Sequence, residues 1–263
     1  MYAHRIEFTS DERDRSEQFS ELTNSYLGTL RMNGQICGSE WPLIRGKRGC
    51  SAIVLTPEAF SLDERFDGKY TREAKTKLSQ AGIAVGSSLM GQDYDGLAVC
   101  DCEPVNGYIL FTTYLSLESP ARCMECFKPR PLYRFPSMPS GEFYEVITWQ
   151  SNYQACDRLQ MNCMVLEAEA TGELSGISSE LTIQGRKTCD QLSTITGQPF
   201  YYYLYRADGE NASAEESTLC PACGGTWLLA KPLHSLFHFK CDNCRIVSNY
   251  SWNLTWDGDL KCC

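Results

Sequence analysis

The first third of the chain alternates between the apolar period of strands and that of helices. Short runs of strand length, either alternating or compactly apolar, predict three strands at residues 2–8, 50–56 and 83–90. Between these runs, apolar side chains recur every three or four positions, which predicts two amphipathic helices. The first has an apolar face formed by Phe19, Leu22, Tyr26 and Leu30, and the second covers residues 69–81 and ends at Gly82.

The start of the first helix carries a capping signal. Thr9 can accept a hydrogen bond from the backbone and Glu12 can reach back toward it, as in a capping box. The resulting order of strand, helix, strand, strand, helix, strand over residues 1–92 is typical of a ferredoxin-like split βαβ unit. Residues 35–43, which would have to supply the second strand, are a poor strand by composition.

The next stretch predicts a strand pair and then a boundary. Residues 97–102 and 108–117 are expected to pair as strands across a polar turn at residues 103–107. Two prolines and a glycine within residues 136–141 make a linker, which is the best candidate for a domain boundary in the sequence.

Beyond that linker the chain is mainly helical before it returns to strand. Helical patterns cover residues 142–163 and 178–196, and the second ends at Gly197. Residues 200–205 are aromatic and strongly β-prone. The acidic residues between 208 and 216 are interpreted as a tether to the last segment.

Two CxxC pairs dominate that last segment. Cys220 and Cys223 are separated by 17 residues from Cys241 and Cys244, within the spacing of about 15–20 that zinc ribbons use. Glycines at 224 and 225 permit the positive φ that a metal-binding turn needs. Four thiolates leave no open coordination position, so the spacing predicts one structural zinc ion and no activated water.

A second group of cysteines has a looser pattern. Cys100 and Cys102 form a CxC pair, and Cys123 and Cys126 form a CxxC pair 20 residues further on. Together they predict a second zinc site, with a reduced thiol pair at the end of a loop as the alternative. The histidines at 234 and 238 stand four residues apart, but the four-cysteine set is complete without them, so packing or surface roles are favoured.

Composition narrows the classes of function. The first residues lack a basic and then apolar leader, and no run of about 18 apolar residues exists to span a membrane. We therefore expect a reducing cytoplasm, where 15 cysteines are metal ligands and buried thiols rather than disulfides. The formal charge of −9 argues against nucleic acid and favours a basic partner, although solubility alone would also explain it.

Two groups of basic residues support the alternative function, which is binding of nucleic acid. The Pro-punctuated segment with Lys128, Arg130 and Arg134, and a glycine-flanked loop at residues 45–48, could contact phosphates. No nucleophile elbow, phosphate loop, dinucleotide fingerprint or HExxH motif occurs in the sequence. Four scattered groups are of the kind that an enzyme uses, but their spacing requires no reaction: Tyr114, Glu118, Asp157 and Arg158.

Three stretches also carry a family resemblance. GYILFTTYLSLESP at 107–120, WQSNYQACD at 149–157 and YYYLYR at 201–206, with the late CxxC pairs, resemble a bacterial family of unknown function. That family is described as zinc-ribbon-containing and as a candidate nucleic-acid binder. The resemblance implies a zinc ribbon at Cys220, Cys223, Cys241 and Cys244, a cytoplasmic location and no assigned catalytic residue. The two late CxxC pairs alone are also similar to double-CxxC immunity proteins, which neutralise bacterial toxins.

These observations together predict an α+β protein in three parts. We expect an N-terminal sheet-and-helix region, of ferredoxin-like order, over residues 1–96. A central α+β region with a helical middle follows at 97–206, and a C-terminal zinc ribbon at 218–254. The expected function is non-catalytic binding of a protein partner, in one form as a cytoplasmic immunity protein against a basic nuclease toxin. A regulator that binds nucleic acid is the alternative.

Overall fold

The computed structural model describes residues 1–10 and 17–255. It divides into two compact units, each built from segments that are not contiguous in sequence. The first contains residues 1–101, 117–119 and 128–144, and the second contains residues 102–116, 120–127 and those from 145 onward. The expected capping box cannot be placed, because Asp11 and Glu12 lie outside the described residues.

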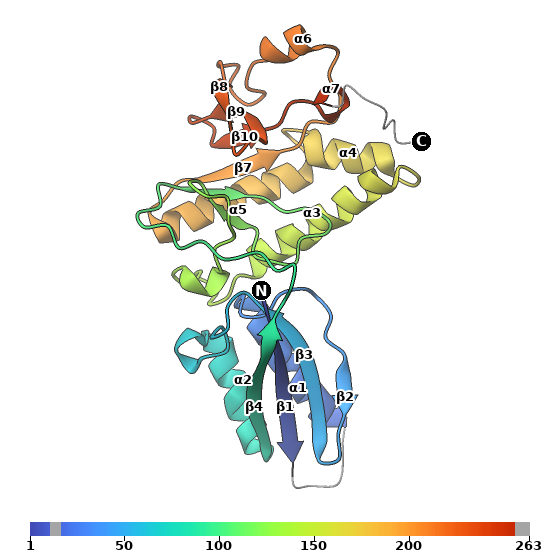
Figure 1. The fold of residues 1–263 in the computed structure, drawn as a ribbon, viewed down its shortest axis with the longest axis vertical. Helices are drawn as coiled ribbons and strands as arrows, with labels where there is room; N and C mark the ends of the chain where they lie inside the picture. The colour runs from blue at the N-terminus through green and yellow to red at the C-terminus, as the bar shows by residue number, and fades with distance from the viewer. Residues whose placement is uncertain (11–16, 256–263) are drawn as a thin grey trace. The chain divides into compact units, whose positions relative to one another are not determined.

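The first unit is a four-stranded antiparallel sheet with two helices. Its elements are β1 (Tyr2–Ser10), α1 (Glu17–Met32), β2 (Leu43–Arg45), β3 (Gly49–Thr56), α2 (Lys69–Gln80) and β4 (Ile83–Gln92). The strand order β2-β3-β1-β4 is that of a split βαβ unit, so the expected ferredoxin-like arrangement is confirmed (Figure 1). Strand β2 has only three residues and begins at Leu43, so the poor strand expected at residues 35–43 is replaced by a short one that follows it.

The core of this unit follows the alternation along β1. Ile6 and Phe8 are buried, while the intervening Glu7 is exposed. Phe8 meets Tyr26 of α1 edge to face, with ring centroids 5.9 Å apart. Each apolar side chain of this size contributes about 1.5–3 kcal/mol when it is buried. Short 3-10 helices at Glu64–Phe66 and Leu132–Arg134 complete the unit.

The second unit is a six-stranded mixed sheet with helices. Its strands are β5 (Tyr108–Leu110), β6 (Ala121–Cys123), β7 (Phe200–Leu204), β8 (Leu228–Leu233), β9 (Phe237–Cys241) and β10 (Ile246–Ser248), in the order β6-β5-β7-β10-β9-β8. Its helices are α3 (Tyr144–Asn162), α4 (Glu167–Ser175), α5 (Glu180–Thr196), α6 (Ala212–Glu216) and α7 (Trp252–Thr255). The whole is therefore a mixed α+β protein with a helical middle and C-terminal strands, as the sequence predicts.

Strand β7 lies at the centre of that sheet. All five of its residues are buried, and it runs parallel to both β5 and β10, as strands covered on both faces commonly do. Helix α5 packs closely on it because position 185 is glycine. A Cβ atom at Gly185 would lie 2.2 Å from the ring of Tyr202 and 2.5 Å from Nε1 of Trp149.

The predicted strand pair at 97–102 and 108–117 is wrong. Only residues 108–110 form a strand, and β5 pairs with β6 and β7 instead. After β5 the backbone turns, because side chains of α3 bind it. Gln154 donates to the carbonyls of Thr113 and Ser116 at 3.1 and 2.6 Å, and Asp157 accepts from the amide of Tyr114 at 2.7 Å.

The interpretation of residues 208–216 as a tether is also wrong. Glu215 is only 2% exposed. Its carboxylate accepts hydrogen bonds from Arg206 Nη2 at 2.6 Å and from Ser251 Oγ at 2.8 Å. Through β10, the last strands continue the sheet of β7, so the cysteine-rich segment is a part of this sheet rather than an appendage.

Candidate metal centres

The turn at the first late CxxC pair is closed by two backbone hydrogen bonds. The amide of Gly224 donates to the carbonyl of Cys220 at 2.8 Å, and the amide of Cys220 donates to the carbonyl of Gly225 at 2.8 Å. Gly224 has φ +70°, while a Cβ built there would meet nothing within 4 Å. Glycine is therefore favoured at 224 by the backbone conformation and not by space.

The second late pair is delivered by a tight hairpin. Between β8 and β9, His234 and Ser235 both have positive φ, at 54° and 57°, which is the conformation of a type I′ turn. Strand β9 ends at Cys241. The amide of Cys244 points at Cys241 Sγ from 3.4 Å, and Arg245, just after the pair, again has positive φ, at 51°.

These two turns bring four sulfur atoms together. The sulfurs of Cys220, Cys223, Cys241 and Cys244 all lie within 4.8 Å of one another. Those of Cys223 and Cys241 are 3.7 Å apart, close to the edge of about 3.8 Å that a tetrahedron with Zn–S bonds of about 2.3 Å requires. Cys220 and Cys241 are buried, and Cys223 is exposed.

The thiols of this set differ in acidity. A hydrogen bond from the backbone of Gly225, with help from the neighbouring thiols, lowers the pKa of Cys223 to about 7. Burial raises the pKa of Cys220 above the ordinary thiol value. Bound zinc would deprotonate all four sulfurs, because a coordinating thiol loses its proton to the charge of the ion.

The earlier CxxC pair adopts the same kind of turn. Strand β6 ends at Cys123, and the amide of Phe127 donates to the carbonyl of Cys123 at 2.9 Å. Phe127 has φ +59°, a conformation that disfavours a residue other than glycine by about 1–2 kcal/mol. Its ring packs against those of Phe111 at 5.1 Å and Phe237 at 5.4 Å, which offsets that strain.

Two further cysteines complete a second set. Cys100 donates its amide to the carbonyl of Pro129 at 2.9 Å, and its own carbonyl accepts from Arg130 Nη1 at 3.2 Å. Cys102 follows two residues later. The four sulfurs of Cys100, Cys102, Cys123 and Cys126 also lie within 4.8 Å of one another. The prediction that these four cysteines approach one another is therefore confirmed.

Both sets have the donor chemistry of structural zinc. Thiolate sulfur is a preferred ligand of Zn²⁺, and four of them fill a tetrahedral shell. Such a shell has no position for water or substrate, so it stabilises the chain around it and performs no hydrolysis. The sets are thus compatible with two zinc sites, and within the described residues they are the two groups of His, Cys, Asp or Glu close enough to hold an ion.

Of the three basic residues predicted to contact phosphate from the Pro-punctuated segment, two are bound by groups within the protein. Arg134 donates from Nε to the buried carboxylate of Glu58 at 2.8 Å and forms an ion pair with it through Nη2. Tyr133 donates to the same carboxylate at 2.6 Å. Arg130 is held by the carbonyl of Cys100, whereas Lys128 is exposed.

The two histidines of the hairpin pack as the sequence favours. Nε2 of His234 lies 2.8 Å from the carbonyl of Met124, and its ring stacks on Phe127 at 5.1 Å. Nδ1 of His238 accepts from the amide of Tyr250 at 3.3 Å, and burial lowers the pKa of His238. Neither histidine belongs to a four-sulfur set.

The four groups of the kind that an enzyme uses lie in or bind the loop that follows β5. Asp157 binds the amide of Tyr114, and burial raises the pKa of its carboxyl although that hydrogen bond opposes the change. Arg158 approaches the carbonyl of Tyr114 at 3.5 Å, while Glu118 accepts from the amide of Leu117 at 3.0 Å. Gln154, which no pattern in the sequence marks, donates to Thr112 Oγ1 at 3.3 Å and to the carbonyls of Thr113 and Ser116, so it also holds this loop against α3.

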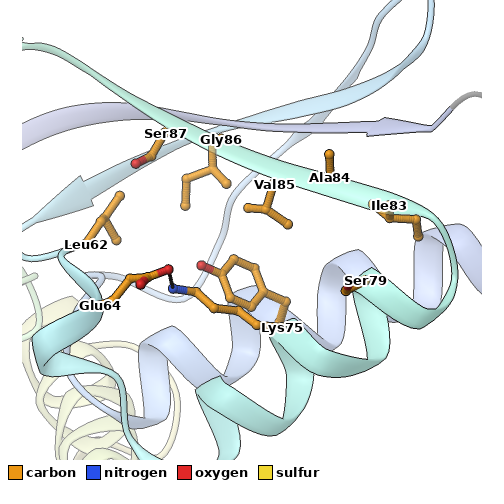
Figure 2. Close-up of a pocket in the computed structure, with 11 residues that line it drawn as sticks. Leu62, Glu64, Lys75, Ser79, Ile83, Ala84, Val85, Gly86 and Ser87 are labelled. Carbon is orange, nitrogen blue, oxygen red and sulfur yellow. Dashed lines mark hydrogen bonds and ion pairs between the residues drawn. The ribbon is translucent and has the colours of Figure 1, made fainter.

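A cavity of about 410 Å³ lies in the first unit, beside β4 and α2 (Figure 2). The Lys75 ammonium reaches into it and pairs with Asp67 at 2.6 Å and with Glu64 at 3.5 Å. The lining residues contain no histidine or cysteine: Ile6, Tyr26, Leu62, Glu64, Lys75, Ser79, Ile83, Ala84, Val85, Gly86 and Ser87.

The sequence of this chain matches known protein families over most of its length. Three family models match, each described as a domain of unknown function: DUF8589 over residues 1–90, DUF2310 over 102–205 and DUF8594 over 209–254. The fold and the sulfur geometry define a mixed α+β protein with two four-cysteine groups. No helix among the described residues is long and apolar enough to cross a bilayer.

Two curated relatives extend the match. An uncharacterized protein of Haemophilus influenzae is 38% identical over 242 residues, which covers 90% of this chain and 93% of the relative. Another uncharacterized protein of that organism is 41% identical over 176 residues, covering 66% of this chain and 87% of the relative. The chain belongs to the family of these proteins, a family whose domains have no assigned function.

Proposed function

We propose that this protein is a non-catalytic cytoplasmic protein, stabilised by two zinc ions, that acts by binding a protein partner. The observation that carries the proposal is the closure of both sulfur sets, Cys100–Cys102–Cys123–Cys126 and Cys220–Cys223–Cys241–Cys244. In this proposal the eight cysteines hold turns in place through zinc. Closed sites of this kind stabilise the fold and the surface that it presents, and they catalyse no reaction.

The charge of the chain supports a basic partner. The formal net charge is −9, and each zinc ion with four thiolates would add about −2 relative to neutral thiols. An acidic surface accelerates encounter with a cationic protein and discriminates against acidic ones. One concrete form of the function is an inhibitor of the immunity or antitoxin type, which would cover the cationic cleft of a nuclease toxin.

The arrangement of Arg134 weighs against the nucleic-acid alternative. Its charge is neutralised by Glu58, whose side chain is 7% exposed, so it is not available to a phosphate. Lys128 and the exposed Arg45, Lys47 and Arg48 are the residues that still favour that alternative. Phosphate contacts dominate nucleic-acid affinity, and these four residues could make only a few such contacts.

Two measurements on purified protein test the proposal. Elemental analysis of protein that has not met a chelator should give about two zinc ions per chain. Labelled duplex and single-stranded oligonucleotides should bind more weakly than about 10⁻⁶ M at physiological salt. Affinity purification from nuclease-treated extract of the native host should recover a basic protein in stoichiometric amount.

The same measurements can reject it. Well under one zinc per chain would remove the structural role of the cysteines. Submicromolar oligonucleotide binding that weakens steeply with salt, and that is lost in Lys128→Ala combined with Arg48→Ala, would make nucleic acid the ligand. Lys231→Ala, a cation on strand β8 outside both basic segments, is the matched control.

A further inference from the structure

The turn between α3 and α4 presents a run of apolar side chains to solvent. Met161, Met164, Val165 and Leu166 are exposed by 48%, 84%, 65% and 57%. Figure 1 shows this turn, coloured yellow-green, where the two helices meet. Soluble proteins rarely leave neighbouring large apolar residues exposed unless they form an interaction site. We call residues 161–166 the α3–α4 tip.

The backbone of the α3–α4 tip is held in an uncommon conformation. Cys163 and Leu166 have φ of +52° and +56°, which residues with a side chain rarely adopt. The amide of Cys163 donates to the carbonyl of Gln160 at 3.2 Å, and Leu166 accepts from the amide of Ala170 at 2.9 Å. Strain of this kind persists where surrounding structure fixes it, and it is concentrated at functional sites.

Helix α4 provides that fixed base. Ala170 and Leu174 are 3% and 0% exposed, so one face of the helix is packed inside the second unit. Glu173 accepts the amide of Leu181 at 2.9 Å, and its carbonyl accepts from Ser179 Oγ at 2.7 Å, which ties α4 to the start of α5. The tip is thus presented on a rigid helix and does not have to be ordered when a partner binds.

The residues that follow the tip in sequence are acidic, and this charge favours a basic partner. Glu167 and Glu169 follow the tip directly and are exposed. Between Arg158 and Arg186 the sequence contains four glutamates and no lysine or arginine. Exposed methionines adapt to varied apolar surfaces, and such a surface with an acidic rim suits a basic amphipathic segment.

We propose that the α3–α4 tip is the docking site for a protein segment that has an apolar face flanked by lysine or arginine. This inference rests on the proposed function and names the surface through which it acts. A second copy of the chain is disfavoured, because a twofold contact would bring Glu167 and Glu169 of both copies together. An anionic lipid surface is disfavoured by the same repulsion.

The test uses the full zinc-loaded chain and two synthetic amphipathic helices of about five turns. Both peptides have leucine on one face, with lysine on the other face of the first and glutamate on that of the second. Fluorescence anisotropy measures each affinity. The lysine peptide should bind, and Met164→Ser combined with Val165→Ser should weaken it about tenfold or more, because two apolar anchors are lost.

Matched variants separate the tip from general effects. Leu89→Ser with Met90→Ser removes two side chains of 53% and 50% exposure from β4, and it should change the affinity less than twofold. Glu167→Gln with Glu169→Gln should weaken binding and flatten its dependence on salt. Circular dichroism and zinc content should stay unchanged in all variants, since these side chains are exposed.

Several outcomes would overturn the proposal. Equal affinity for the lysine and glutamate peptides, or full affinity in the tip variant, would remove the tip as a docking site. Sedimentation of the wild type, but not the tip variant, with phosphatidylserine vesicles would assign it to lipid. Self-association of the wild type that the tip variant loses would assign it to a second copy. Zinc content and oligonucleotide binding report on the proposed function separately.

Discussion

Replacing Cys223 by serine isolates the contribution of one zinc ion to stability. Cys223 is exposed, so the substitution removes almost no packing and acts through the metal. Apparent binding free energies of structural zinc are about 10–16 kcal/mol. If four thiolates share this equally, the loss of one weakens binding by about 2.5–4 kcal/mol, which is a factor of about 10²–10³.

The shared sheet determines how far that loss spreads. Cys241 and Cys244 flank the turn that joins β9 to β10, and β10 pairs with β7 through Ile246 and Tyr202. Because β7 lies at the centre of the sheet, we expect the whole second unit to be weakened. For a unit of this size, about 2–4 °C per kcal/mol gives a fall in Tm of about 5–16 °C.

Three measurements check this prediction. Competition with a chelator should show that the late cysteine set binds zinc about 10²–10³ times more weakly than in the wild type, and calorimetry should show the lower Tm. Hydrogen exchange should show lost protection in β7 and α5 as well as in β8–β10. Cys156→Ser, at a half-buried cysteine outside both sulfur sets, should keep both zinc ions. Unchanged protection of β7 and α5, with loss confined to β8–β10, would refute the reasoning from the shared sheet.

Three smaller changes test other parts of the structure. Arg134→Ala should lower the free energy of unfolding in urea by about 3 kcal/mol, because Glu58 is left buried without its cation; Arg134→Met with Glu58→Gln should recover most of it. Gly224→Ala and Gly197→Ala should each lower the free energy of unfolding by about 1 kcal/mol, since both positions have positive φ and open space, and Gly224→Ala should keep two zinc ions. Asp157 has a raised pKa in the folded state, so wild-type stability should fall as pH rises just above about 3.9, the ordinary aspartate value. In urea titrations across that range, Asp157→Asn should lose this dependence.

The parts of the fold that the sequence predicts well have strong local signals. The helices of the first unit repeat apolar residues over several turns, and their alternation with strands constrains the topology to few arrangements. The eight cysteines could be grouped from spacing alone, because a CxxC turn presents two sulfurs whatever surrounds it. Phe127 was not identified from sequence, since its positive φ is fixed by aromatic packing from distant residues.

The pairing of the second sheet could not be predicted in the same way. Strands β5, β6 and β10 have three residues each, too few for a period of two to be recognised. Their partner strands are up to about ninety residues away in sequence, so no local turn motif predicts the pairing. The signal that was available is β7 itself: an uninterrupted aromatic strand must be covered on both faces and paired on both edges.

Within the second unit, aromatic contacts connect the turn at Cys123 and Cys126 to the hairpin that delivers Cys241. The ring of Phe127 stacks on His234 and meets Phe237, while Nε2 of His234 lies 2.8 Å from the carbonyl of Met124. Each turn therefore relies on the other for the packing that holds its positive-φ residue in place. Because bound zinc would fix both turns and the turns support this packing, we expect the affinity of one sulfur set for metal to depend on whether the other is filled. With two zinc ions bound as proposed, the late cysteines would form one half of a coupled pair of centres rather than a self-contained ribbon.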